Sequence, residues 1–222
     1  MKILAFDTTN QTLSVAIIFD EKIVAQENIL TANQHSAMLT PLIEQCLKKS
    51  EIWYCDLDLI AFTNGPGSFT GIRVGFSCAK ALAIATDVPI VAVSSLAAIA
   101  YSYLSENKKI LVVNDARLDE FYLQEFVVEN GHLKSNFEPV MIKDEKIGEF
   151  IGEGEFILAG SAKNMIKDGL EEATIYPEDD FIDAKNIAIL GKEIFKNQGA
   201  GENNQALYIR KPKITQRKRK KV

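Results

Sequence analysis

Two stretches far apart in this chain resemble each other, and this internal repeat constrains the fold more than any other feature of the sequence. ILVVNDARLDEFYLQEF at 110–126 follows the order of ILAFDTTNQTLSVAIIF at 3–19, with a strand, a polar turn and a second strand. Asp7 corresponds to Asn114 without a gap, or to Asp115 after a shift of one residue. Two hairpins can be alike by chance, but the elements that follow also repeat roughly. We therefore predict a duplicated fold.

The elements expected in the first half alternate between strands and helices. A third strand at 22–30 would complete an antiparallel meander, and apolar residues at helical spacing predict a helix at 34–49. A strand at 57–63 precedes a glycine-rich turn and a helix that ends near residue 86. A strand at 90–93 and a helix at 94–105 complete this half.

The second half is expected to add strands near 137–142 and 156–159, a short helix after the latter, and a helix at 184–197. Asp183 is suited to cap that last helix. The prediction is an α/β chain of mixed sheets flanked by helices. Its parts would be two similar halves and a basic segment, at 1–106, 107–208 and 209–222.

The composition excludes several classes of protein. At 47% hydrophobic residues the chain is too apolar to be disordered throughout, and its apolar runs are too short to span a bilayer. No secretory signal is visible at the start. The three cysteines are odd in number and form no CxxC motif, which favours reduced thiols over disulfides or a zinc site. These features predict a cytoplasmic protein that does not interact with membranes.

Positive charge is concentrated at one place. The formal net charge is −5, yet residues 209–222 hold eight Lys or Arg and no acid, which leaves 17 basic against 30 acidic residues elsewhere. Such a segment is too charged to pack. One interpretation is that it binds nucleic-acid phosphates without sequence preference, chiefly through Arg217, Lys218, Arg219, Lys220 and Lys221. The other is that it keeps the protein soluble or is attracted to the acidic body, and the sequence leaves both open.

Two polar turns are candidates for a phosphate or nucleotide site. The hydroxyls and N–H groups of Asp7-Thr8-Thr9 are suited to hold a phosphate, and the carboxylate a magnesium ion. The same residue types also stabilise ordinary hairpin turns, which is the interpretation that local sequence favours. Gly160-Ser161 follows a strand and could lie against a base, although one glycine limits how closely a ligand can approach.

A glycine-rich turn is the strongest local signal. It follows a strand and opens a helix, where anions bind readily, and consists of Gly65, Pro66, Gly67, Ser68, Phe69, Thr70 and Gly71. It lacks the Lys-Ser/Thr of a Walker A loop, and its spacing fits a Rossmann fingerprint poorly. A structural role is favoured, in which glycine permits a sharp turn and Ser68 or Thr70 caps the helix.

The following helix carries a small residue at every fourth position from Gly71 to Ala83. This row would let another helix approach closely, or it could be buried against the chain's own sheet. Because the helix at 34–49 is also amphipathic, the two helices could form half of a four-helix bundle with a partner. The predicted interface comprises Met38, Leu42, Cys46, Gly71, Gly75, Cys78, Ala79, Leu82 and Ala83.

Catalytic motifs are scarce. The two histidines, His35 and His132, form no close pair and no HExxH motif. Asp115, Asp119 and Glu120 could cluster, but solvated carboxylates of a hairpin are the simpler account. We therefore expect neither a catalytic residue nor a metal site in this chain.

Several motifs together carry a resemblance to a known family: FDTT at 6–9, QHSAMLTPLI at 34–43, NGPGSFTGIRVG at 64–75, VSSLAAIA at 93–100 and NDAR at 114–117. The chain resembles the TsaB (YeaZ) family, bacterial partner proteins in threonylcarbamoyladenosine modification of tRNA, closely over about the first 120 residues and loosely thereafter. The resemblance implies the ASKHA fold of actin, sugar kinases and Hsp70, with two ribonuclease-H-like halves.

The resemblance also implies a function without catalysis. Such a subunit pairs with the catalytic subunit TsaD through the helices at 34–49 and 71–86, and the ATPase TsaE joins them. The complex transfers a threonylcarbamoyl group to the adenosine beside the anticodon, and the lone subunit forms a homodimer. ATP or ADP and metal are expected on TsaD and TsaE. TsaD holds its metal with histidines on its first helix, and the corresponding segment here has only His35. The glycine run of nucleotide-binding members is degenerate here, at 158–162. Asp7-Thr8-Thr9 would therefore keep a structural role without binding a phosphate.

Other classes of protein fit less well. A phosphotransferase of the same fold would place Asp7 and Gly160 beside a magnesium nucleotide and would bind ATP alone. A peptidase would need a nucleophile and base or a complete zinc set, which the sequence does not supply. A Rossmann dehydrogenase would bind nicotinamide cofactor at the glycine turn, but the expected order of elements opposes it.

Overall fold

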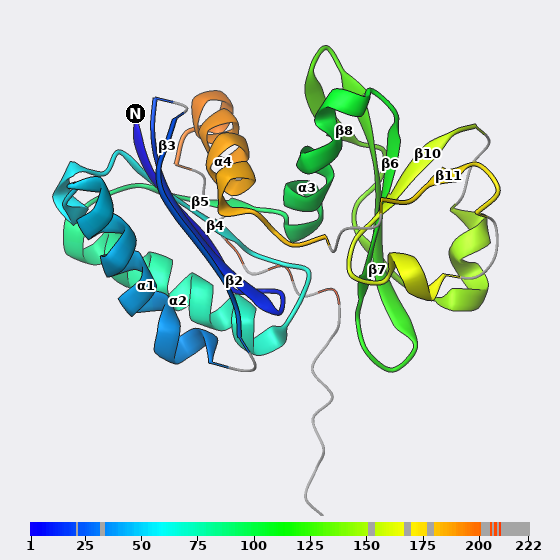
Figure 1. The fold of residues 1–222 in the computed structure, drawn as a ribbon, viewed down its shortest axis with the longest axis horizontal. Helices are drawn as coiled ribbons and strands as arrows, with labels where there is room; N and C mark the ends of the chain where they lie inside the picture. The colour runs from blue at the N-terminus through cyan, green and yellow to red at the C-terminus, as the bar shows by residue number, and fades with distance from the viewer. Residues whose placement is uncertain are drawn as a thin grey trace, which may run out of the picture.

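The computed structural model describes residues 1–20, 22–31, 34–150, 154–166, 170–176, 180–200, 205, 207 and 209. Two β-sheets lie side by side with two helices between them, and two longer helices cover the outer face of the first sheet (Figure 1). No helix within these ranges is long and apolar enough to cross a membrane. The α/β architecture with mixed sheets that the repeat predicts is confirmed.

The first sheet has the order β3-β2-β1-β4-β5. Its strands are β1 (Lys2–Asp7), β2 (Thr12–Phe19), β3 (Lys22–Leu30), β4 (Leu59–Thr63) and β5 (Ile90–Val93). The first three pair antiparallel, and β4 and β5 run parallel to β1. The predicted meander is therefore confirmed, and the predicted strand at 57–63 begins two residues later than expected.

Helices α1 (His35–Ser50) and α2 (Phe69–Thr86) pack side by side on this sheet. Their buried faces complete an apolar cluster with the strand residues that point the same way, including Leu4, Phe6, Ile60 and Phe62. Burial of large apolar side chains is the main stabilising contribution here, at about 25 cal/mol per Å² of apolar surface.

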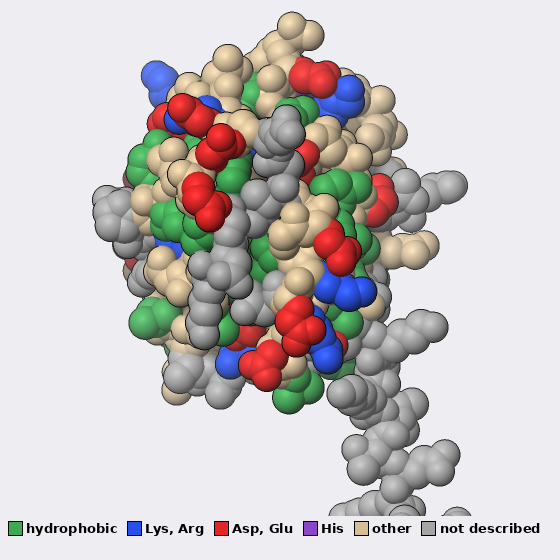
Figure 2. All heavy atoms as spheres, turned by 90° about the vertical axis from the view of Figure 1, so that its right-hand side faces the viewer, with side chains coloured by type: hydrophobic (Ala, Val, Ile, Leu, Met, Phe, Trp, Pro, Cys, Tyr) green, Lys and Arg blue, Asp and Glu red, His purple; other side chains and the backbone are tan. Residues whose placement is uncertain are grey.

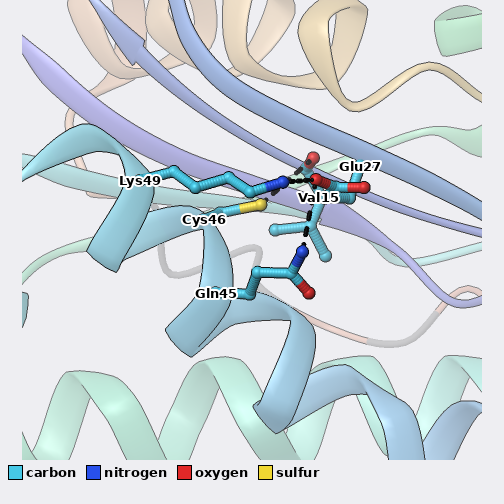
Figure 3. Close-up of polar contacts among 5 residues, drawn as sticks. All are labelled: Val15, Glu27, Gln45, Cys46 and Lys49. Carbon is cyan, nitrogen blue, oxygen red and sulfur yellow. Dashed lines mark hydrogen bonds and ion pairs between the residues drawn. The ribbon is translucent and has the colours of Figure 1, made fainter.

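Polar contacts fix α1 against β2 and β3 (Figure 3). Lys49 forms an ion pair with Glu27, and Gln45 Nε2 donates to the same carboxylate at 3.5 Å. On the same helix, the Cys46 thiol lies 4.0 Å from the carbonyl oxygen of Val15. Burial, with a contribution from the Glu27 charge, raises the pKa of Cys46 to about 11, so this thiol is a structural group.

The second sheet has the order β11-β10-β6-β7-β8, and β9 pairs with β7. Its strands are β6 (Lys109–Asp115), β7 (Glu120–Glu129), β8 (His132–Ser135), β9 (Val140–Lys143), β10 (Phe156–Ala159) and β11 (Ala173–Thr174). The strand predicted near 137–142 corresponds to β9, whereas β8 was not expected. The short helix expected after residue 161 is only a 3₁₀ turn, Lys163–Met165.

The two inner helices each pack on the sheet of the other half. Helix α3 (Ser95–Ala100), which continues as a 3₁₀ helix to Glu106, contacts β6 and β7. Helix α4 (Ala184–Gln198) lies on β1, β2, β4 and β5, and Asp183 caps it by accepting from the Lys185 N–H, as predicted. The two helices thus lie between the sheets (Figure 1), and a central core spans both halves. The boundary at residue 106 stays a prediction.

The repeat is visible in the directions of the side chains. Ile3 and Ala5 of β1 face the central core, as do Ile110 and Val112 of β6. The residues between them face the outer clusters of their own halves. Because side chains alternate along a strand, this agreement favours the gapless register, in which Asp7 corresponds to Asn114.

Candidate functional site

A cavity of about 900 Å³ opens between the two halves. Thr9 and its neighbours line it from the first hairpin turn, and Ser68, Thr70 and Gly71 line it from the start of α2. The second half contributes Asp115, Arg117, Gly160, Ser161, Lys163, Asn164, Asp180 and Phe181. The structure therefore brings together three turns that the sequence singled out separately. We refer to this cavity as the cleft.

The first turn is buried at its base. Asp7 is fully buried, and its Oδ1 accepts from the Thr9 N–H at 3.0 Å, from the Thr9 hydroxyl at 2.6 Å and from the Thr63 hydroxyl. Its Oδ2 has no hydrogen-bond partner within the described residues. Burial raises the pKa of the Asp7 carboxyl, although these hydrogen bonds act in the opposite direction. Asp7 lies beneath the wall of the cleft and does not line it.

The glycine turn packs directly on this first turn. The Ser68 N–H donates to the Thr9 carbonyl at 2.8 Å, and the Thr8 hydroxyl donates to the Gly71 carbonyl at 2.7 Å. A Cβ atom at Gly67 would lie 2.6 Å from the Thr9 oxygen, and one at Gly71 would lie 1.9 Å from the Thr8 oxygen. The predicted structural role of these glycines follows from this contact.

Ser68 is the helix cap that the sequence offered as one of two choices. Its hydroxyl accepts from the Gly71 N–H at 3.2 Å. Thr70 instead is exposed and lines the cleft. Position 65 requires glycine for a different reason. Its φ of +108° lies in a region of backbone conformation that residues with a side chain rarely adopt.

The row of small residues on α2 faces the chain's own sheet. A Cβ on Gly75 would point at the Thr8 hydroxyl, only 2.5 Å away, and Ala79 has no exposed surface. Leu42 and Cys46 of α1 are buried in the same cluster. The prediction of a partner contact is therefore wrong for Gly71 and Gly75, because Thr8 of the first turn occupies the space beside them. It is also wrong for Ala79, Leu42 and Cys46, because these side chains are buried in the chain's own apolar cluster. Met38, Cys78, Leu82 and Ala83 are half-buried.

The exposed surface of the same two helices consists of other residues. Pro41 of α1 and Ala81, Ile84 and Ala85 of α2 face solvent, and Ile84 is 85% exposed. Phe69, 39% exposed, lies under the Arg73 guanidinium with 3.9 Å between Cζ and the ring centre. The outer face thus combines small and apolar groups with charged side chains such as Lys48 and Lys80, and the sequence pattern did not separate these residues from the buried row.

The second-half wall of the cleft contains a buried ion pair that sequence reasoning missed. Lys163 Nζ lies 3.0 Å from Asp180 Oδ2, and the two side chains are only 3% and 7% exposed. Asp180 also accepts from the Gly160 N–H at 2.7 Å and from the Tyr103 hydroxyl. No local motif links a lysine and an aspartate this far apart in sequence.

Hydrogen bonds join the Gly160-Ser161 turn to residues at the end of β6. The Ser161 N–H donates to the Asn114 side chain at 2.9 Å, and the Asp115 N–H donates to the Ser161 hydroxyl at 3.1 Å. Gly160 has a φ of +105°, and a Cβ there would lie 2.3 Å from the Val113 oxygen. The two hydrogen bonds therefore attach the turn to the end of β6.

The remaining candidates are dispersed. His35 lines the cleft, and its ring nitrogens lie 3.4–3.5 Å from the Thr31 hydroxyl. His132 is remote from it, 3.6 Å from Glu193 on α4. Across the described ranges, no group of three His, Cys, Asp or Glu is arranged to hold a metal ion. The basic residues Arg217, Lys218, Arg219, Lys220 and Lys221 lie outside the described residues.

Comparison with known proteins gives a consistent family signal. Residues 23–194 match the family model described as TsaD, tRNA N6-adenosine threonylcarbamoyltransferase. The tRNA threonylcarbamoyladenosine biosynthesis protein TsaB of Escherichia coli is 31% identical over 166 residues, covering 72% of this chain and 71% of that protein. TsaB of Bacillus subtilis is 35% identical over 134 residues, but the alignment spans only 58% of its length and 60% of this chain.

Solved structures confirm the fold. YeaZ from Pseudomonas aeruginosa superimposes with a TM-score of 0.84 at 22% identity, over 93% of this chain and 99% of that one. A more remote match is component A of the Acidaminococcus fermentans (R)-2-hydroxyglutaryl-CoA dehydratase, with a TM-score of 0.51 at 10% identity, over 87% of this chain and 98% of that one. The ASKHA fold that the sequence motifs implied is therefore the fold of this chain.

Proposed function

We propose, from the premise that this chain belongs to the TsaB family of tRNA threonylcarbamoyladenosine biosynthesis proteins, that it is a non-catalytic subunit which binds and activates TsaD. The observation that carries the proposal is the family match over residues 23–194 together with the TsaB relatives. In this proposal TsaD transfers the threonylcarbamoyl group to the adenosine beside the anticodon of tRNA.

The contact with TsaD is proposed on the outer face of α1 and α2. This face carries Pro41, Ala81, Ile84 and Ala85, among charged residues of the same two helices such as Lys80. Exposed apolar groups on neighbouring elements favour burial against a partner. The half-buried Met38, Cys78, Leu82 and Ala83 would lie at the base of this contact and not at its centre.

The absence of a catalytic role is proposed from the cleft. Asp7 lies beneath the wall, and the Lys163–Asp180 ion pair holds the Gly160 N–H within the protein. Groups already bonded to one another would have to be released before they bound a phosphate or a base. In this proposal ATP or ADP and metal bind to TsaD and TsaE. This chain alone would bind neither nucleotide nor metal.

The proposed assembly has further members. TsaE joins the pair, and tRNA binds through the complex, which functions in the cytoplasm. In isolation the same outer face of α1 and α2 would be covered by a second copy, giving a homodimer. One surface would therefore serve two alternative partners.

Capture of TsaD tests the interface. A tagged chain should retain TsaD from the same cell, whereas Ala81→Arg should reduce capture at least about tenfold, because a long cation would stand on a face of small residues. The matched control is Asn197→Arg on the exposed end of α4, across the sheet from α1 and α2. Equal capture by wild type and Ala81→Arg would contradict this interface. Failure of wild type to retain TsaD with ATP, ADP or no nucleotide would overturn the proposed function.

A reconstituted reaction tests the catalytic assignment. TsaD, TsaE, tRNA and the threonylcarbamoyl-adenylate should form modified tRNA several-fold faster with this chain than without it. The chain alone should form none. Product formation by the chain alone would instead favour an enzyme of the same fold, and tight ATP binding by the lone chain would favour a phosphotransferase.

A further inference from the structure

A second cavity, of about 470 Å³, lies between the two halves and away from the cleft. It is lined by Ile3 of β1 and Ile18 of β2, which pair with each other near the start of β1, the end marked N in Figure 1. The cleft is lined instead by the turn that follows Asp7, at the other end of β1. The two cavities therefore lie at opposite ends of the same strand pair, and the proposed function gives the second cavity no role.

Both halves form the walls of the second cavity. Ala188 and Ile189 contribute from α4, which packs on the first sheet. Tyr101 contributes from the 3₁₀ helix that follows α3, and His132 from the start of β8, and these two elements contact each other. Enclosed spaces of about 300–1,000 Å³ between domains are common sites for small ligands. A ligand in this cavity would contact both halves.

The floor of the second cavity is apolar. Ile3, Ile18 and Ala188 are at most 3% exposed and belong to the central core, and Tyr101 packs against that core. On the outer face of the second half, by contrast, apolar side chains lie among acidic and basic ones (Figure 2). The apolar groups gathered on this floor are suited to the hydrocarbon part of a ligand, because their contact removes apolar surface from water.

Two lysines stand beside this floor on one side of α4. Lys192 and Lys196 follow Ala188 at intervals of four residues, and all three line the cavity. Because residues four apart share a helix face, this face changes from apolar to basic along its length. The charge of the two lysines exceeds the roughly half unit of negative charge at the C-terminal end of a helix. A ligand with its apolar part on the floor would therefore place its other end beside ammonium groups.

The acidic groups near these lysines have partners of their own. Glu193 lines the cavity and faces His132, with 3.6 Å between Oε1 and Nδ1. Asp20, whose charge also interacts with Lys192, accepts a hydrogen bond from the N-terminal amine. Among the described residues, none forms an ion pair with Lys196. A negatively charged group on the ligand is therefore the complementary charge at this end of the cavity.

We propose that the second cavity binds a small amphipathic monocarboxylate, with its apolar body against Ile3, Ile18 and Ala188 and its carboxylate beside Lys196. A volume of about 470 Å³ equals that of about 15 water molecules, so a ligand of about 10–15 non-hydrogen atoms fits. Hydrogen bonds between ammonium groups and carboxylates are among the stronger ones, because both partners are charged. This inference goes beyond the proposed function and does not depend on it.

Calorimetric titration of the full chain with octanoate tests this site, because octanoate joins a carboxylate to a short apolar chain. One octanoate should bind per chain, with a dissociation constant of about 1 mM or below. Octanol and octylammonium have the same apolar chain without the negative charge, and they should bind at least about fivefold more weakly. Acetate, which lacks the apolar chain, should show no saturable binding. Octanol or octylammonium binding as tightly as octanoate would overturn the proposal, as would octanoate that does not saturate the chain.

A charge reversal on α4 locates the carboxylate. Lys196→Glu should weaken octanoate binding at least about tenfold, because two carboxylates would then face each other. The matched control Lys185→Glu makes the same change of charge at an exposed residue of the same helix that does not line the cavity. It should bind octanoate within about twofold of wild type. Equal losses in the two variants would mean that net charge alone attracts octanoate, and the site would be wrong.

A bulky substitution tests the apolar floor. Ile189→Trp would fill part of the cavity, so it should weaken the binding of octanoate and octanol alike, by at least about tenfold. Thermal unfolding shows whether this variant is folded, and Lys196→Glu, at an exposed position, decides the question if it is not. Wild-type affinity for octanoate in a folded Ile189→Trp protein would place the ligand elsewhere and overturn the proposal. If the chain retains TsaD but does not bind octanoate, only this inference falls.

Discussion

The Asp7 turn of the first half and the Asn114 turn of the second occupy equivalent places in the repeat, but the buried carboxyl groups near them differ in their partners. At Asp7 a carboxyl group is bonded to hydroxyl groups and one N–H, with no cation beside it and one oxygen unpartnered within the described residues. In the second half, Asn114 accepts from the Ser161 N–H, and the adjacent Gly160 N–H donates to Asp180. The Asp180 carboxylate faces the ammonium group of Lys163 at 3.0 Å.

This difference indicates what each half can tolerate. A buried carboxyl without a cation is stabilised by becoming neutral, and its pKa is accordingly raised by burial. A buried ion pair remains stable only while both members are present. The first turn should therefore respond to pH, and the second to loss of either charged side chain. The four predictions below test this contrast, from the largest expected effect to the smallest.

Loss of the Lys163 charge should have the largest effect on stability. Lys163→Met removes the cation and leaves the Asp180 carboxylate buried, which should lower the free energy of unfolding by about 3–5 kcal/mol. Urea denaturation at neutral pH measures this change. The control Lys196→Met, at an exposed position of α4, should remain within about 0.5 kcal/mol of wild type.

A double variant separates the ion pair from packing. Lys163→Met combined with Asp180→Asn removes both charges while an oxygen remains to accept from the Gly160 N–H. It should recover most of the lost stability, because neutral replacements of a buried pair are often tolerated. A double variant as unstable as Lys163→Met would mean that shape, and not the unpaired charge, caused the loss.

A methyl group at Gly71 should have the next largest effect. Gly71→Ala would place Cβ 1.9 Å from the Thr8 oxygen, so the first turn or α2 must move, at a cost of about 3 kcal/mol. Gly148→Ala, where nothing lies within 4 Å, should be neutral or slightly stabilising. Thermal unfolding of the two variants provides the comparison. A Gly71→Ala protein as stable as wild type would show that the two turns are not tightly packed.

The pH dependence of the first turn should be smaller and should be removed by Asp7→Asn. Because burial raises the pKa of Asp7 above its ordinary 3.8, the folded state keeps a proton that the unfolded chain has released. The free energy of unfolding should therefore fall as pH rises from about 3.8 to the raised pKa, by at most about 1.4 kcal/mol per pH unit.

Urea denaturation of wild type and Asp7→Asn across this range isolates the contribution. The stability of wild type relative to the variant should be highest at low pH and level off above the raised pKa. If wild type instead gains relative stability as pH rises, the hydrogen bonds from Thr9 and Thr63 would outweigh burial. The first turn would then hold an ionised carboxylate.

Periodicity and the repeat predicted most of the fold. The strands at 2–7 and 12–19 and the helix at 35–50 agree closely with expectation because alternation and helical spacing are local signals. The exchange of α3 and α4 between sheets could not be predicted in this way. It depends on which sheet has an open face once the chain has folded, and that is a long-range property.

The candidate site was only partly predictable. The sequence identified the three turns that meet at the cleft, since each breaks a strand with polar or glycine residues. It did not identify Lys163 and Asp180, because their pairing depends on the path of the chain between them. Spacing also marked Gly71 and Gly75 as positions of close approach, but it could not show that Thr8 of the first turn fills the space beside them.

The smallest expected effect concerns the hydroxyl groups around the two carboxyls. Tyr103→Phe removes one donor to Asp180, and Thr63→Val removes one donor to Asp7. Each should cost about 1 kcal/mol at neutral pH, but the loss at Asp7 should be larger than that at Asp180, because no cation compensates there. Urea denaturation of both variants at the same pH measures the difference. Equal losses would mean that the Lys163 cation does not make Asp180 less dependent on its hydroxyl donor than Asp7 is. The contrast between the two halves would then not hold.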